Sequence, residues 1–172
     1  MTGQGVHWRR FFDEKGPCGM DRLEPDAFAS QYERDFYAWT QQQAAALRRR
    51  AAAALDWDNL AEEIDALGRS EREAVESHLE TIVEHLLKLV FSPVDSPRRG
   101  WRVSVAAARV NADRKLTPTY RRHLAETLAT RYGYGRRLAA AGLAEDGLGA
   151  ADLPAECPWT LDQLLDPDFW PS

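Results

Sequence analysis

The chain has 172 residues, 44% of them hydrophobic and 28% charged, with a formal net charge of -5 at pH 7. This length suits a single domain with a sizeable core. The two cysteines, Cys18 and Cys157, have no metal-binding or redox spacing, so neither a disulfide framework nor a structural zinc site is predicted, and the expected compartment is the reducing cytoplasm. No signal peptide and no membrane span are predicted, because no segment approaches ~18 uncharged apolar residues.

Residues 1–25 are rich in glycine and proline without a sustained period, and this pattern predicts a flexible amino-terminal arm. Residues 26–172 are predicted to form one all-helical domain. Its first helix is expected to start after Pro25, with Asp26 as its cap, and to run to Leu55. The aromatic residues of this segment recur at helical spacing, which predicts that they pack as a stripe against the long helix that follows: Phe28, Tyr32, Phe36 and Trp39.

The central element of the chain is a long predicted helix from Leu60 to Phe91, around which the other helices should pack. One apolar sector continues along it at 100° per residue, comprising Leu60, Ile64, Leu67, Val75, Ile82, Leu86 and Leu89. The pattern predicts that other helices cover this sector. Asp58 or Asn59 is expected to cap the helix, and Gly68 is a candidate for a kink or break.

Three further helices follow. The tract SPVDSPRRG should end the central helix, and a third helix is predicted from about Trp101 to Lys115. Thr117 and Pro118 form a cap and first-turn pair that opens a fourth helix toward Leu143, which glycines 133 and 135 are expected to weaken midway. The segment TLDQLL is predicted as a short carboxyl-terminal helix capped by Thr160, with Gln163 completing a capping box. The fold class is therefore all-α, a compact bundle of about four main helices.

The charges divide between two parts of the chain. Residues 56–84 contain ten acids and two arginines, whereas residues 98–137 contain eleven bases and two acids. Acidic and basic helices lying side by side would partly neutralise each other, which is the simplest interpretation. The alternative is a basic surface for an anionic partner.

Four stretches together resemble a known family. They are YERDFYAWTQQQAAALRRR, WDNLAEEIDALGRSEREAVESHLETIVEHLLKL, SPRRGWRVSVAAAR and LPAECPWTLDQLLDPDFWP. The chain is similar over about residues 31–171 to the bacterial family called domain of unknown function 29, and its most specific blocks are NLAEEIDALGRSE and CPWTLDQLLD. The resemblance implies an all-helical fold and supplies no catalytic residues. It also leaves the first 30 residues outside the family's usual span.

One candidate metal site lies on the central helix, where Glu71, His78 and His85 recur every seven residues close to the apolar sector. Residues seven apart rise about 10.5 Å along a helix, too far for one helix to close a site. Ligands from another helix would be needed, with His123, Glu33 and Asp35 as candidates. The preferred interpretation is that the histidines are structural, and no cofactor is predicted.

The second candidate site is basic and begins the third helix, with Arg98, Arg99, Trp101 and Arg102 as its residues. Arginines beside a tryptophan suit phosphates and stacked bases, but the sequence pI near 5.4 does not favour a dedicated nucleic-acid binder. The leading hypothesis is a non-catalytic protein that binds another protein or itself. The alternatives are a metal-dependent helical-bundle enzyme and nucleic-acid binding through residues 98–122.

Overall fold

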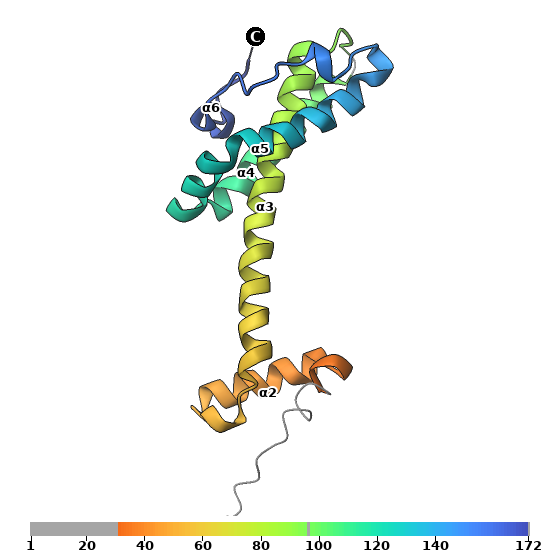
Figure 1. Cartoon of the computed structure of the whole chain (residues 1–172). Coiled ribbons are helices and arrows are strands. Elements are labelled where there is room, and N and C mark those ends of the chain that lie inside the picture. The colour runs from red at the N-terminus through yellow and green to blue at the C-terminus, as the bar shows by residue number, and fades with distance from the viewer. Residues whose placement is uncertain (1–30, 96, 172) are drawn as a thin grey trace, which may run out of the picture. The chain divides into compact units, whose positions relative to one another are not determined.

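Helices are the only regular elements in the part of the chain that the structure, a computed structural model, describes: residues 31–95 and 97–171. This confirms the all-α fold class. The predicted arm, Cys18 and the expected cap at Asp26 lie outside these residues. The chain divides into two compact units, one ending at Ala61 and the other beginning at Glu62. We call residues 31–61 the amino-terminal unit and residues 62–171 the bundle unit (Figure 1). No helix among the described residues combines the length and the apolar character needed to span a membrane.

The amino-terminal unit contains helix α2 (Phe36–Arg48) and a short 3-10 helix, η1 (Ala52–Ala54). The prediction of one uninterrupted helix up to Leu55 is therefore wrong, because the helix is interrupted at Asp35. The Asp35 side chain accepts a hydrogen bond from the Ala38 backbone N–H at 2.9 Å and so caps α2. Arg50 closes the other end with a φ of 56°, a left-handed conformation that a helix cannot include.

The link between α2 and the following helix is held by Asp56. Its carboxylate accepts hydrogen bonds from the Trp39 indole N–H at 3.1 Å and from the Asn59 side-chain amide at 2.7 Å. The backbone N–H of Asp56 donates to the Gln43 side chain at 2.9 Å. Trp39 and Gln43 are both buried, so this polar cluster fixes the turn. Asp56 thus occupies the position that the sequence suggested for Asp58 or Asn59.

Helix α3 (Trp57–Phe91) is continuous for 35 residues. The helix does not break at Gly68. No side chain and no backbone of another element lies within 4 Å of the place where a Cβ would stand there. The predicted apolar sector is buried only in part. Val75, Ile82 and Leu86 are at most 1% exposed, whereas Ile64 and Leu67 are 69% and 65% exposed. The expectation that other helices cover the whole sector is therefore wrong for its first turns.

The bundle unit adds α4 (Arg98–Lys115), α5 (Pro118–Leu143) and α6 (Leu161–Leu165), with two 3-10 helices, η2 (Ala144–Asp146) and η3 (Ala150–Asp152), between α5 and α6 (Figure 1). The predicted caps Thr117 and Thr160 are confirmed, each accepting from a backbone N–H, and Gln163 completes the second capping box. The core joins all four helices of this unit through Leu79, Ile82, Leu86, Val105, Leu124, Tyr132, Leu143 and Leu164.

Helix α5 is not interrupted at its glycines, and Gly135 has a packing role. A Cβ at this position would lie 2.7 Å from the Val83 side chain and 2.8 Å from the Glu80 carbonyl oxygen on α3. The absence of a side chain lets α5 approach α3 closely. Gly133, two residues earlier, has nothing within 4 Å of such a Cβ. Close helix packing explains one glycine and leaves the other without a structural explanation.

Candidate interaction surface

The three residues of the predicted metal candidate each have a different environment. The Glu71 carboxylate pairs with the Lys115 ammonium of α4 at 2.6 Å. The His85 Nδ1 lies 2.9 Å from the Thr81 carbonyl of its own helix, and His123 pairs instead with Glu76. No group of three or more His, Cys, Asp or Glu residues within the described ranges is arranged to hold a metal ion. Asp35, another of the ligands considered, uses its side chain to cap α2 instead.

His78 is half-buried beside the ion pair of Glu71 and Lys115. Burial lowers the pKa of its imidazole below the ordinary value, and the positive charge of Lys115 lowers it further. The neutral form is therefore favoured. Helix α4 thus supplies a cation to the face of α3 where a metal was considered, and the positive charge of Lys115 opposes the binding of a second cation there.

The basic candidate site is divided among separate contacts. Arg98 donates to the carbonyl oxygens of Leu89 at 2.6 Å and Ser92 at 3.0 Å, and so stabilises the carboxyl-terminal end of α3. Trp101 packs against the core, and the Arg102 guanidinium lies 5.3 Å from the centre of the Trp170 ring. Arg99 is exposed. The simplest interpretation of the charge division, in which bases of this helix face acids of the central helix, is therefore wrong for Arg98 and Arg102.

Arg109 has a role that the sequence did not indicate. Although it is only 4% exposed, it donates to the Leu164 carbonyl at 2.9 Å and makes longer bonds to the carbonyls of Pro167 and Gln163. Its guanidinium also lies 5.1 Å from the Trp170 ring centre. Burial lowers its pKa, and nearby Asp166 partly opposes that shift. Arg109 therefore joins α4 to the end of α6 and the segment after it.

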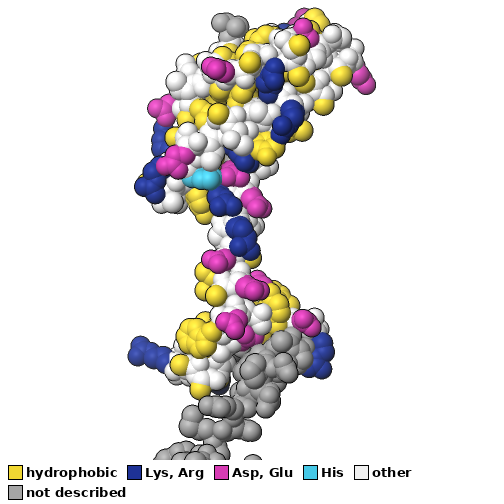
Figure 2. Space-filling view, viewed as in Figure 1, with side chains coloured by type: hydrophobic (Ala, Val, Ile, Leu, Met, Phe, Trp, Pro, Cys, Tyr) yellow, Lys and Arg dark blue, Asp and Glu magenta, His cyan; other side chains and the backbone are white. Residues whose placement is uncertain are grey.

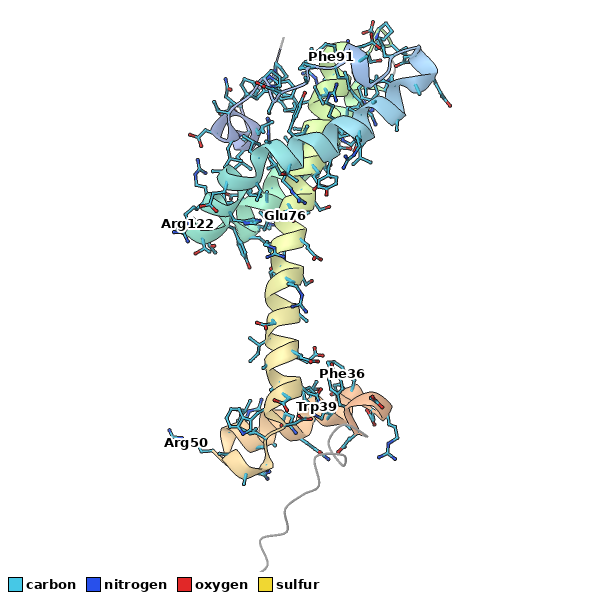
Figure 3. The ribbon with its side chains drawn as sticks, in the orientation of Figure 1. Phe36, Trp39, Arg50, Glu76, Phe91 and Arg122 are labelled. Atoms are coloured by element: carbon cyan, nitrogen blue, oxygen red, sulfur yellow. The ribbon has the colours of Figure 1, made fainter. Side chains whose placement is uncertain are left out.

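Glu76 is buried at the centre of a partly buried ion network between α3 and α5 and is labelled in Figure 3. Its side chain contacts His123 Nε2 at 2.5 Å and the Arg131 guanidinium at 3.1 Å, and Arg131 also reaches Glu80 at 2.9 Å. With both oxygens of Glu76 engaged, the network acts as a clamp between helices. The sequence signal for this network is the four-residue spacing of Glu76 and Glu80 on α3, matched by His123 and Arg131 eight residues apart on α5.

The acidic and basic parts of the chain pair within the bundle unit. Lys115 binds Glu71, and Arg131 binds Glu76 and Glu80, so bases of α4 and α5 meet acids of α3. Figure 2 shows the two signs of charge interspersed over the visible face of this unit. Ion pairing within the chain between its acidic and basic parts is therefore confirmed. It leaves exposed charges at Glu62, Asp65 and Glu73 on α3 and at Arg99 and Arg114 on α4.

The Cys157 thiol is partly buried and hydrogen-bonded. The thiol donates to the Trp159 carbonyl at 3.2 Å, and burial raises the pKa of the thiol. The nearby Tyr132 hydroxyl donates to the Pro154 carbonyl at 2.6 Å, and burial raises the pKa of that hydroxyl as well. Both groups are held in their neutral forms. The Tyr132 hydrogen bond attaches the segment before α6 to α5.

Exposed apolar side chains lie on each of the three long helices of the bundle unit, with Tyr134 and Leu138 on α5, and those of α3 and α4 form two further surfaces. The first, which we call the α3 stripe, consists of Ile64 and Leu67, which lie about 60° apart on the same face of the helix. The second, the α4 strip, has Val103 and Val110 at its centre, 62% and 52% exposed. At 100° per residue its exposed members share one outward face of α4: Arg99, Val103, Ala106, Ala107, Val110 and Arg114.

A groove runs along one edge of the α4 strip. Its volume is about 410 Å³, and it is lined by Ala106, Arg109, Val110, Asp113, Arg114, Leu165 and Pro167. Arg109 is already directed at the carbonyls of the carboxyl-terminal segment. The groove extends the apolar area of the strip toward α6 and gives it a concave side, which is the form that an inserted side chain requires.

Comparisons with curated proteins and with solved structures find no match to this chain. One family model does match, and its description is Domain of unknown function DUF29. The match covers residues 31–170, which include all the helices described above. The chain therefore belongs to the DUF29 family.

Proposed function

We propose that this protein is a non-catalytic interaction module that works by binding a protein surface. One observation carries the proposal: Ile64 and Leu67 are 69% and 65% exposed on a helix whose later turns bury the same apolar sector completely. Single exposed apolar residues are ordinary, but two large ones on one face, a turn apart, form a patch that costs free energy in water. A protein partner would remove that cost.

The surroundings of the stripe suit a partner rather than a substrate. The stripe is convex, since it lies on the outside of one helix, whereas small-molecule sites are concave. Gly68 beside it has open space around it, so a partner's backbone can approach closely. Separately from the stripe, the amino-terminal unit taken by itself has exposed aromatic residues, Tyr37 at 74% and Trp57 at 60%.

The two alternatives receive less support from the contacts of their residues. For a metal-dependent enzyme, Glu71 is bound to Lys115 and His123 to Glu76. For a nucleic-acid binder, Arg98 and Arg109 donate to backbone carbonyls, and Arg121 pairs with Asp162. These contacts stabilise the bundle, and the side chains that make them are not available to an external ligand.

The proposal is tested by placing a photocrosslinking amino acid at position 67 in the native cell. Position 62 is the matched control, because it is exposed on the same helix but points about 140° away. We expect a protein adduct of the chain from position 67 and little from position 62. Equal yields at the two positions, or no adduct at either, would contradict binding through the α3 stripe.

A further inference from the structure

We infer that the turn after α2 is a second docking surface and that its occupant is an acidic segment of a partner protein. We call this surface the arginine turn and define it by its exposed residues: Leu47, Arg48, Arg49, Arg50, Ala52 and Ala53. It lies in the amino-terminal unit, whereas the α3 stripe belongs to the bundle unit. The arginine turn is therefore a site beyond the proposed function and does not depend on it.

Arg50 has a backbone conformation that favours glycine. Its N–H donates to the Leu47 carbonyl at 3.0 Å, and the N–H of Ala51 donates to the Ala46 carbonyl at 3.0 Å. This pair of hydrogen bonds ends many helices and places a left-handed residue, most often glycine, where Arg50 stands. The chain uses glycine at its other left-handed position among the described residues, Gly147. With a φ of 56°, Arg50 is therefore an arginine where glycine would be more stable.

Nothing in residues 31–95 and 97–171 compensates for this strain. The Arg50 guanidinium makes no hydrogen bond, ion pair or ring contact with a described residue, and neither does that of Arg48 or Arg49. Figure 3 shows Arg50 directed away from the ribbon. The helix dipole accounts for Arg48 in the last turn of α2, but Arg50 lies beyond the helix. Because strained residues cluster at binding sites, the charge of Arg50 indicates an outside partner.

No acid among the described residues of this unit pairs with the arginine turn. Asp35 caps the first turn of α2, and Asp56 accepts a hydrogen bond from Trp39. Along the axis of α2, Asp35 and Trp39 lie about 19.5 and 13.5 Å before Arg48. Asp58 is exposed and forms no ion pair with a described residue. The positive charge of the turn is therefore open to an outside anion.

The distribution of charge favours a short acidic segment over a long polyanion. The described residues of this unit carry four arginines and four acids, so their net charge is zero and only the turn is basic. A nucleic acid or an anionic membrane presents negative charge over a wide area and would also face Asp58. Two or three carboxylates close together match three adjacent guanidiniums, which bind carboxylates through paired hydrogen bonds. Leu47, 51% exposed beside them, adds an apolar contact that a protein segment can cover.

The strain is tested first, because Arg50→Gly should improve folding. Removing the Cβ should raise the equilibrium constant for folding of the amino-terminal unit about fivefold, while Arg50→Lys should leave it unchanged. Hydrogen exchange of α2 in the full chain measures the change as slower exchange. Exchange of α2 no slower in Arg50→Gly than in the wild type would show that the position is not strained and would overturn the inference.

The occupant is tested by a photocrosslinking amino acid at position 53 in the native cell, followed by sequencing of the crosslinked segment. Position 41, exposed earlier on α2, is the matched control. We expect an adduct from position 53, little from position 41, and a crosslinked protein segment with three or more clustered acids. Arg50→Gly and Arg49→Gln should each lower the yield at least about threefold, because each removes a charge that the carboxylates face. Arg50→Lys and Arg122→Gln, which alters an exposed arginine of α5, should keep it.

Each other outcome overturns the inference. A nuclease-sensitive adduct or a lipid adduct would assign the turn to a polyanion instead. A crosslinked segment without clustered acids, no adduct at position 53, an unchanged yield in Arg50→Gly, or an equal loss in Arg122→Gln would each exclude recognition of an acidic segment by this turn. Failure of the crosslinking at position 67 would overturn the proposed function alone.

Discussion

Replacing Arg109 with methionine should destabilise the bundle unit strongly, and the structure gives the magnitude. The guanidinium makes one short hydrogen bond, to the Leu164 carbonyl at 2.9 Å, two longer ones, and a contact with the Trp170 ring at 5.1 Å. A charged hydrogen bond contributes about 1.5–3 kcal/mol and the ring contact about 0.5–1. Methionine keeps the apolar volume, so the expected loss is about 2–4 kcal/mol.

Arg102→Met is the matched control. Arg102 is exposed and approaches the same Trp170 ring at 5.3 Å, and within the described part of the chain its guanidinium makes no hydrogen bond to a backbone carbonyl like those of Arg109. Its replacement should cost under about 1 kcal/mol. Urea unfolding followed by circular dichroism measures both, and with a slope of about 2 kcal/mol/M the Arg109 variant should unfold at a midpoint lower by about 1–2 M. A cost for Arg109→Met no larger than that of Arg102→Met would refute the reasoning.

Three further changes follow from the packing and the charges. Gly135→Ala should destabilise by about 1–3 kcal/mol in urea unfolding, because its Cβ would overlap Val83, and wild-type stability would show that α5 does not approach α3 this closely. Gly133→Ala, which meets nothing, should instead stabilise by up to about 1 kcal/mol through helix propensity, and a loss there would contradict that packing. His78 has a lowered pKa, so the unfolded chain takes up its proton first, near the ordinary value of 6.5, and stability is lost as the pH falls through that region. Unfolding at several pH values between about 7.5 and 5 should show a smaller loss for His78→Gln, and an unchanged slope would count against the shift.

The elements with local signals were predictable from the sequence, and those set by distant contacts were not. Thr117 with Pro118, and Thr160 with Gln163, place their helix starts correctly because a cap depends on residues within one turn. Asp35 was missed because the aromatic spacing continues across it.

The candidate site was less predictable than the fold. Burial of Glu76 and Arg109 depends on α5 and on the carboxyl-terminal segment, 47 and 55 residues away in sequence. The exposure of Ile64 and Leu67 could not be predicted from the sequence either, because a helical period identifies an apolar face without saying what covers it.

Coverage of the α3 stripe by a protein partner can be measured on the unmodified protein. Hydrogen exchange followed by mass spectrometry, on the purified chain and on the chain isolated with the proteins bound to it in the native cell, reports the protection of residues 62–73. We predict slower exchange of this segment in the isolated assembly and unchanged exchange in the core of α5. Identical exchange of residues 62–73 in the two samples would contradict the account.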